Sequence, residues 1–207
     1  MDRDASWEVI AGQRTALADL LDGLAPEQWE APSLCEGWRV RDVAAHVALT
    51  PQHPGPGAML VGAVRARGDF DRLNRDLALA HAERGPDRLV AELRAHAANR
   101  RLPVVTTYRN LLFDVLVHVQ DVAIPLGVEQ PMPVAAAREG VQRVWSMGWP
   151  FHARRRLGGM RLVATDSDWT AGDGPEVHGT TGALLLLLTG RTAAALPRLA
   201  GPGCRAL

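Results

Sequence analysis

LLFDVLVHVQD, at residues 111–121, is the stretch of the sequence that decides the fold. Apolar residues cover nearly every side of a helix drawn through it, which predicts a helix buried in a core. The same stretch contains two carboxylates and an imidazole, at Asp114, His118 and Asp121. Because their spacings are four and three residues, all three side chains project from one face of the helix.

Ionisable groups in such an apolar helix need partners. A buried carboxylate is costly unless it is paired, hydrogen-bonded or bound to a cation, so we expect a positive group opposite this face. An acid-x-x-x-His pattern is short, and by itself it favours an internal pair between Asp114 and His118. A metal site is the other interpretation, and a second stretch of the sequence, around His46, supports it.

Composition and charge are those of a soluble globular protein. Of the 207 residues, 47% are hydrophobic and 22% are charged, enough for one large domain or two small ones. The 23 basic and 23 acidic residues balance, so the sequence has no broad footprint for nucleic acid or anionic membranes. Every basic residue is arginine, which is typical of a GC-rich genome and hints at a bacterial source.

Cysteine usage and the absence of targeting signals indicate the cytoplasm. Cys35 and Cys204 form neither a C-x-x-C pair nor a disulfide framework. The first residues lack the basic and apolar regions of a signal peptide. The longest apolar run, residues 183–188, is far shorter than the ~18–20 residues that cross a bilayer. We therefore expect a soluble cytoplasmic protein in a reducing compartment.

Helical periodicity dominates the first half of the chain. It predicts helices over residues 3–24, 39–49, 59–84, 86–100 and 106–122, with a Pro- and Gly-rich loop at 50–58. His46 lies on or beside an apolar face, where a histidine is more often part of the core than a ligand. His81 and His96 are expected at the surface. Helices joined by short loops predict a bundle, and bundles often build metal sites from inward side chains.

The composition changes after Gly127. The sequence predicts a helix over 134–147, a strand at 160–164, a turn between hairpin strands at 166–175, and a Leu-rich helix over 181–189 that Thr180 caps. A short helix then extends to Leu199. The fold class is therefore α+β, with a helical bundle over residues 1–127 and a small α/β domain over residues 128–207.

Three blocks of the sequence carry a family resemblance. They are PSLCEGWRVRDVAAHV at residues 32–47, DVLVHVQD at residues 114–121 and ALLLLLTGR at residues 183–191. With these blocks the chain resembles, over nearly its whole length, the mycothiol-dependent maleylpyruvate isomerase family. That family belongs to the wider DinB-like group of metal-binding four-helix bundles. The first block is the most specific, whereas Leu-rich helices like the third are common. The resemblance implies a DinB-like four-helix bundle in the first half.

The resemblance also implies a metal site. The residues that match the family's ligands are His46, Asp114 and His118, which would hold one divalent metal, most often zinc. The family's acid is typically glutamate, and aspartate is one methylene shorter, so its oxygen reaches less far. Two imidazoles and a carboxylate leave a fourth position open, as a catalytic zinc site requires. Asp121 matches a family acid that we expect to orient a ligand rather than to bind the metal.

The function that the resemblance implies is a thiol-dependent reaction. The thiol of mycothiol would occupy the open metal position, where the metal lowers its pKa. The resulting thiolate would add to a small electrophilic substrate, for isomerisation or S-transfer. Arg191 is the best positional match for a catalytic arginine that binds substrate carboxylates, although an arginine just past a helix C-terminus also complements the helix dipole. The expected partners are the substrate and the thiol, with no nucleic acid or membrane, for a monomer or homodimer.

Two other functions stay open. A metal-dependent hydrolase would use the same metal with bound water as the nucleophile. A non-catalytic bundle would bind a small molecule or a partner, with Asp114 and His118 as a buried structural pair. This last interpretation predicts that added metal changes neither stability nor activity.

Overall fold

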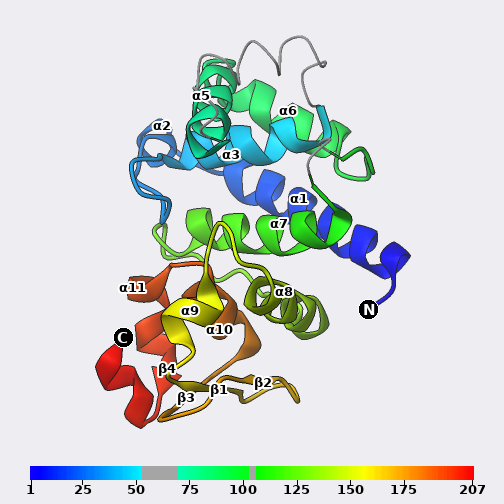
Figure 1. Cartoon of the computed structure of the whole chain (residues 1–207). Helices are drawn as coiled ribbons and strands as arrows, with labels where there is room; N and C mark the ends of the chain where they lie inside the picture. The colour runs from blue at the N-terminus through cyan, green and yellow to red at the C-terminus, as the bar shows by residue number, and fades with distance from the viewer. Residues whose placement is uncertain (53–69, 103–105) are drawn as a thin grey trace. The chain divides into compact units, whose positions relative to one another are not determined.

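A computed structural model describes residues 1–52, 70–102 and 106–207 (Figure 1). Most of the predicted loop at 50–58 and the first part of the predicted helix at 59–84 lie outside these residues. The chain divides into two compact units that are each discontinuous in sequence. The boundary between them falls inside one helix, α7 (Tyr108–Ala123). The division into domains 1–127 and 128–207 stays a prediction.

The helical unit comprises residues Ile10–Thr107 and His118–Glu129. Its α3 (Val40–Leu49) packs against α5 (Phe70–Ala82) and α6 (Pro86–Ala95). Most side chains of α3 are apolar, and they are buried on nearly every side of the helix. The elements that contribute to this unit are α1 (Arg3–Asp22), α2 (Pro26–Trp29), α3 (Val40–Leu49), η1 (Thr50–Gln52), α5 (Phe70–Ala82), α6 (Pro86–Ala95) and the second half of α7.

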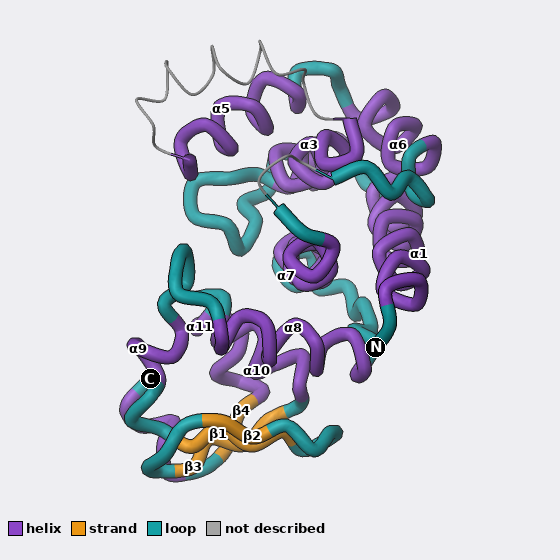
Figure 2. Tube along the Cα trace, turned by 45° about the vertical axis from the view of Figure 1, so that its right-hand side comes forward, coloured by secondary structure: helices purple, strands orange, loops and turns teal. Residues whose placement is uncertain are grey.

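The mixed unit comprises Met1–Val9, Tyr108–Val117 and Gln130–Leu207. Its sheet has the order β2-β1-β3-β4, and α10 lies against β1 and β3 (Figure 2). β1 pairs in parallel with β3, whereas β1 with β2 and β3 with β4 are antiparallel. The strands are β1 (Arg161–Ala164), β2 (Thr170–Ala171), β3 (Glu176–Gly179) and β4 (Leu199–Ala200). The helices are α8 (Val134–Ser146), α9 (Ala153–Leu157), α10 (Thr181–Leu188), α11 (Thr192–Ala195), η2 (Leu196–Arg198) and η3 (Pro202–Ala206).

The Leu-rich helix α10 forms as the sequence predicts. The Thr180 hydroxyl oxygen accepts a hydrogen bond from the backbone N–H of Ala183 at 3.2 Å, which caps the first turn. Gly190, with φ of +90°, follows the last turn in a conformation that favours glycine. A Cβ at Gly140 of α8 would lie 3.0 Å from Leu185 Cδ2, so the missing side chain lets α8 and α10 pack closely.

Helix α7 confirms the expectation of burial on most sides. Leu111, Leu112 and Phe113 are at most 5% exposed in the mixed unit, and the Phe113 ring packs edge-to-face on Phe151 at 5.9 Å. Val122, in the helical unit, is fully buried. A helix that is apolar all round can therefore contribute to two cores along its length.

The predicted fold class is confirmed, since helices dominate and a small four-stranded sheet lies near the C-terminus. Local predictions were wrong in several places. The helix predicted over 86–100 ends at Ala95. Residues 50–52 form a 3-10 turn, in which the Thr50 hydroxyl donates to the Val47 carbonyl. The segment 166–175 includes β2, and the following strand, β3, runs parallel to β1. His81 is buried, and its Nε2 has a polar partner there, Glu92 Oε2, at 2.7 Å.

Among the residues that the structure describes, no helix has the length and hydropathy needed to span a membrane.

Candidate metal centre

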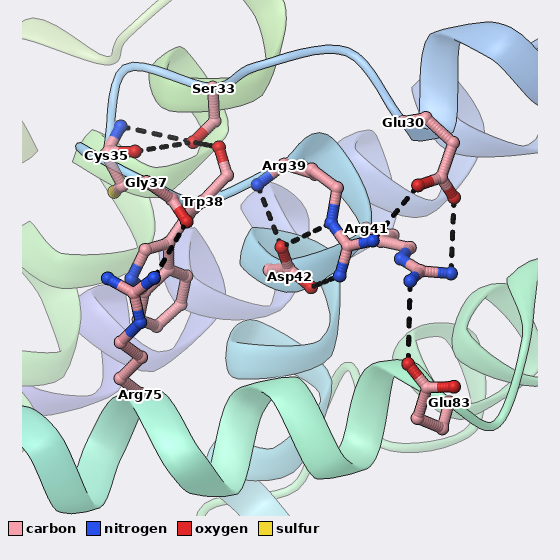
Figure 3. Close-up of polar contacts among 10 residues, drawn as sticks. All are labelled: Glu30, Ser33, Cys35, Gly37, Trp38, Arg39, Arg41, Asp42, Arg75 and Glu83. Atoms are coloured by element: carbon pink, nitrogen blue, oxygen red, sulfur yellow. Dashed lines mark hydrogen bonds and ion pairs between the residues drawn. The ribbon is translucent and has the colours of Figure 1, made fainter.

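The loop between α2 and α3 is held in shape by its own polar groups (Figure 3). The Ser33 hydroxyl donates to the Trp38 carbonyl at 2.9 Å and accepts from the Cys35 N–H at 3.1 Å. The N–H of Trp38 donates to the Cys35 carbonyl at 3.0 Å, and Arg75 of α5 donates to the Gly37 carbonyl at 3.2 Å. These bonds fix the backbone that carries the Cys35 thiol.

The start of α3 is fixed by a buried carboxylate (Figure 3). Asp42 is 1% exposed, and its Oδ2 accepts from both the backbone N–H and Nε of Arg39 at 2.9 Å. An acid in the first turn also complements the positive end of the helix dipole. His46 lies four residues after Asp42, one turn along the same helix, so this contact fixes the start of the helix that carries His46.

The imidazole of His118 lies at the centre of a polar cluster. Its Nδ1 is 2.8 Å from Asp121 Oδ2, and the Cys35 thiol donates to the same oxygen at 3.1 Å. Cys35 Sγ and His118 Nδ1 are 3.8 Å apart. Asp121 is fully buried, and the His118 side chain is 13% exposed. A carboxylate that accepts the Nδ1 proton fixes the tautomer in which Nε2 is the ligand nitrogen.

His46 contributes a second imidazole beside the first. The rings of His46 and His118 meet edge-to-face with centroids 4.7 Å apart. The rings of Trp38 and His46 also meet edge-to-face, with centroids 5.8 Å apart. His46 is 8% exposed. The predicted pair of histidines, one from α3 and one from α7, is thus adjacent in the structure.

Among the residues that the structure describes, two groups of side chains have the composition and spacing of metal ligands, and they share His118. In one, ligand atoms of His46, Asp114 and His118 all lie within 4.8 Å of one another. In the other, the same holds for Cys35, His118 and Asp121. Asp114 lies one turn before His118 on α7. Two imidazoles with one carboxylate are a donor set of catalytic zinc sites, so the residues present fit the metal that the sequence implies.

Arg191 belongs to the mixed unit, between α10 and α11. Its Nη1 donates to the Thr189 carbonyl at 2.8 Å, directly after the last turn of α10. This contact is the one expected of a cation that complements a helix C-terminus. A role in binding substrate stays a prediction. Cys204, in η3 of the same unit, is half-buried.

Cys35 is the polar group of this cluster that sequence reasoning left without a role. It lies in the block that contains His46, and the backbone N–H of the preceding residue, Leu34, donates to the Asp121 carbonyl at 3.1 Å. A single cysteine has no spacing pattern, so only its place within that block could have directed attention to it.

Comparisons with known proteins identify the family and agree with the fold. A family model described as the mycothiol maleylpyruvate isomerase N-terminal domain matches residues 10–123. Crystal structures of the mycothiol-dependent maleylpyruvate isomerase and of a mutant of it superpose with a TM-score of 0.64 at 16% identity. The alignment covers 98% of this chain and 93% of that one, and at this identity it shows the fold. No curated protein matches the sequence. Because the family model covers more than half of the chain, this protein belongs to the mycothiol maleylpyruvate isomerase N-terminal domain family.

Proposed function

We propose that this protein is a metal-dependent enzyme that uses mycothiol to act on a small electrophilic substrate carrying carboxylates. The observation that carries the proposal is the group of His46, Asp114 and His118, whose ligand atoms lie within 4.8 Å of one another. Family membership supports the thiol, since the family takes its name from a mycothiol-dependent isomerase. The reaction is isomerisation or S-transfer, in the cytoplasm, by a monomer or homodimer.

The metal, most simply zinc, would be held by His46, Asp114 and His118. When bound, it supplies the positive charge that lowers the pKa of a thiol or water at its open position. The Asp121 carboxylate accepts the Nδ1 proton of His118 at 2.8 Å and so presents Nε2.

Aspartate in place of the family's glutamate is compatible with this role. Asp114 and His118 are separated by one turn of a continuous helix, so the shorter side chain still projects along the same face. The spacing of their ligand atoms, within 4.8 Å, supports a shared ion. Asp114→Glu is therefore expected to retain the metal.

The experiment that tests the metal site is elemental analysis of protein purified without chelator or histidine tag. We expect about one zinc per chain in the wild type and almost none in His46→Ala. His178→Ala is the matched control, because His178 pairs with Glu176 in the mixed unit and is 37% exposed. Wild-type protein that holds no metal after incubation with zinc would overturn the proposal.

Reaction type is tested on the zinc-loaded protein. Turnover of maleylpyruvate, or of another small unsaturated dicarboxylate, should require mycothiol. Arg191→Lys keeps the charge but loses the planar fork, so it should raise KM for the dicarboxylate if Arg191 binds it. Ester hydrolysis without any thiol would instead favour the hydrolase. Tight binding of such ligands without turnover would favour the non-catalytic bundle.

A further inference from the structure

We infer that Cys35, His118 and Asp121 form a second metal position, one that takes thiophilic ions such as Cd²⁺. We also infer that its occupation excludes zinc from the position formed by His46, Asp114 and His118. The first statement stands on the geometry of the helical unit alone. The second rests on the proposed function, because it requires zinc on the other nitrogen of His118.

Donor spacing suits a metal ion. A tetrahedral ion with bonds of about 2.3 Å to sulfur and about 2.0 Å to nitrogen separates these two donors by about 3.5 Å. Cys35 Sγ and His118 Nδ1 are 3.8 Å apart, close to this value. Asp121 Oδ2 lies 3.1 Å from the sulfur and 2.8 Å from the nitrogen, so all three donors already face one another. An ion would replace the two hydrogens that now bridge them.

The three donors are held by structure outside the cluster. Cys35 lies in the loop that the Ser33 hydroxyl braces, and the Leu34 N–H ties this loop to the Asp121 carbonyl. Asp121 and His118 are one turn apart on α7, and Asp121 is fully buried. All three residues belong to the helical unit. A preorganised donor set needs little rearrangement to bind an ion.

Ligand chemistry separates the two positions. A thiolate is a soft donor that binds thiophilic ions such as Cd²⁺, and two imidazoles with a carboxylate are a donor set of catalytic zinc sites. The position that contains Cys35 has a sulfur, and the position that contains His46 and Asp114 has none. Cd²⁺ should therefore prefer the position that contains Cys35.

The two metal positions compete because they use different nitrogens of the same His118 ring. With zinc on Nε2, His118 keeps its proton on Nδ1 and donates it to Asp121. With an ion on Nδ1, the ring proton moves to Nε2, where it blocks zinc, and the Cys35 thiol proton is released to the buffer. A neutral imidazole has one lone pair in the ring plane, so it serves one position at a time. Cys35 thereby makes the enzyme sensitive to soft metals.

The test of the site is a titration of metal-free protein with Cd²⁺, followed by thiolate-to-cadmium charge-transfer absorption in the ultraviolet. The wild type should develop the band to saturation, and Cys35→Ser should lose it. Cys204→Ser is the matched control, because it removes the other half-buried thiol and should keep the band. Absence of the band in the wild type, or its persistence in Cys35→Ser, would overturn the site.

The test of competition uses zinc-loaded protein and a colorimetric zinc indicator. Cd²⁺ should release zinc from the wild type but much less from Cys35→Ser, whose zinc content should equal that of the wild type. Equal release from both proteins would show direct replacement at the first position and would overturn the competition. Zinc content itself tests the proposed function, so the failure of either proposal is visible separately.

Discussion

In the described part of the helical unit, two histidines pair with buried carboxylates at almost equal distances. His81 Nε2 lies 2.7 Å from Glu92, and His118 Nδ1 lies 2.8 Å from Asp121. The carboxylates are 3% and 0% exposed. By distance and burial alone the two pairs are equivalent, so what distinguishes a structural pair from a candidate site must be the groups around them.

Glu92 is also contacted by two permanently charged arginines. Its Oε1 accepts from Arg84 at 2.6 Å and from Arg88 at 2.9 Å. Burial by itself raises the pKa of Glu92, but the hydrogen bond from His81 and those from the two arginines and Gln52 outweigh it and lower the pKa from 4.5 to about 2. This charge is already balanced, so the pair does not need an added cation.

Around Asp121 the contacts are of another kind. A thiol and an imidazole face its Oδ2, and the second imidazole of His46 lies beside the first. These groups are metal ligands as well as hydrogen-bond donors. A buried histidine–carboxylate pair is therefore informative about function only together with its neighbours.

The largest expected effect separates the pairs directly. His118→Ala should lower zinc from about one per chain to near zero, because it removes a ligand. His81→Ala should keep the zinc and lower the melting temperature, since it leaves Glu92 with one fewer donor. Metal analysis and thermal unfolding of both variants measure this. Loss of zinc in His81→Ala would show that the pair of His81 and Glu92 also supports metal binding.

Glu92→Gln should cost about 3 kcal/mol in the free energy of unfolding at neutral pH. The figure follows from a pKa lowered from 4.5 to about 2, at about 1.4 kcal/mol per unit. Urea denaturation measures it, and zinc content should not change. A cost well below 1 kcal/mol would mean that the arginines contribute little.

The difference in the free energy of unfolding between wild type and Glu92→Gln should depend on pH. A carboxyl group whose pKa is lowered by folding stabilises the protein above the unfolded value, and this contribution is lost as the pH falls from about 4.5 towards about 2. The stability gap between wild type and Glu92→Gln should therefore close over this range. A gap that stays constant would assign the effect of the substitution to packing.

Asp121→Asn should have an intermediate effect on the other pair. Removing the charge that orients a ligand histidine typically weakens metal binding about 10–100-fold. Competition with a zinc chelator measures the affinity, and Glu92→Gln, at the buried carboxylate of the other pair, is the control. Unchanged affinity in Asp121→Asn would show that Asp121 does not orient His118.

The smallest expected effect is a loss of stability at a residue that has no role in metal binding. Thr180→Ala removes the cap of α10 and should cost about 1 kcal/mol, with zinc content unchanged. Thermal or urea unfolding in the presence and absence of zinc measures it. A change in zinc content would show that α10 influences the metal position.

Local sequence patterns predicted two buried helices and one helix cap correctly. The buried helix around Phe113, the Leu-rich helix and its cap at Thr180 all follow from periodicity and hydrogen-bonding preference. The parallel pairing of β1 with β3 does not, because it depends on the short strand β2 inside a turn-rich segment. The family resemblance that the sequence suggested is confirmed.

The sequence predicted only some residues of the candidate site. Asp114 and His118 were found by their spacing on one helix, and His46 by the resemblance. The prediction that His81 lies at the surface, made because it occurs among Arg, Glu and Ala, was wrong, since its partner Glu92 lies on α6, beyond the turn at Gly85. Cys35 was missed as a neighbour of Asp121 because contacts between a loop and a distant helix have no periodicity.

The boundary inside α7 has a consequence for protein synthesis. Residues 108–117 belong with residues 130–207, so their apolar side chains gain their full set of partners only after the rest of the chain has left the ribosome. At about 5–20 residues per second, the ribosome needs roughly 5–20 s to add residues 118–207. Until then Leu111, Leu112 and Phe113 lack these partners, and a chain truncated after residue 123 would carry an apolar helix without the core that covers its first half.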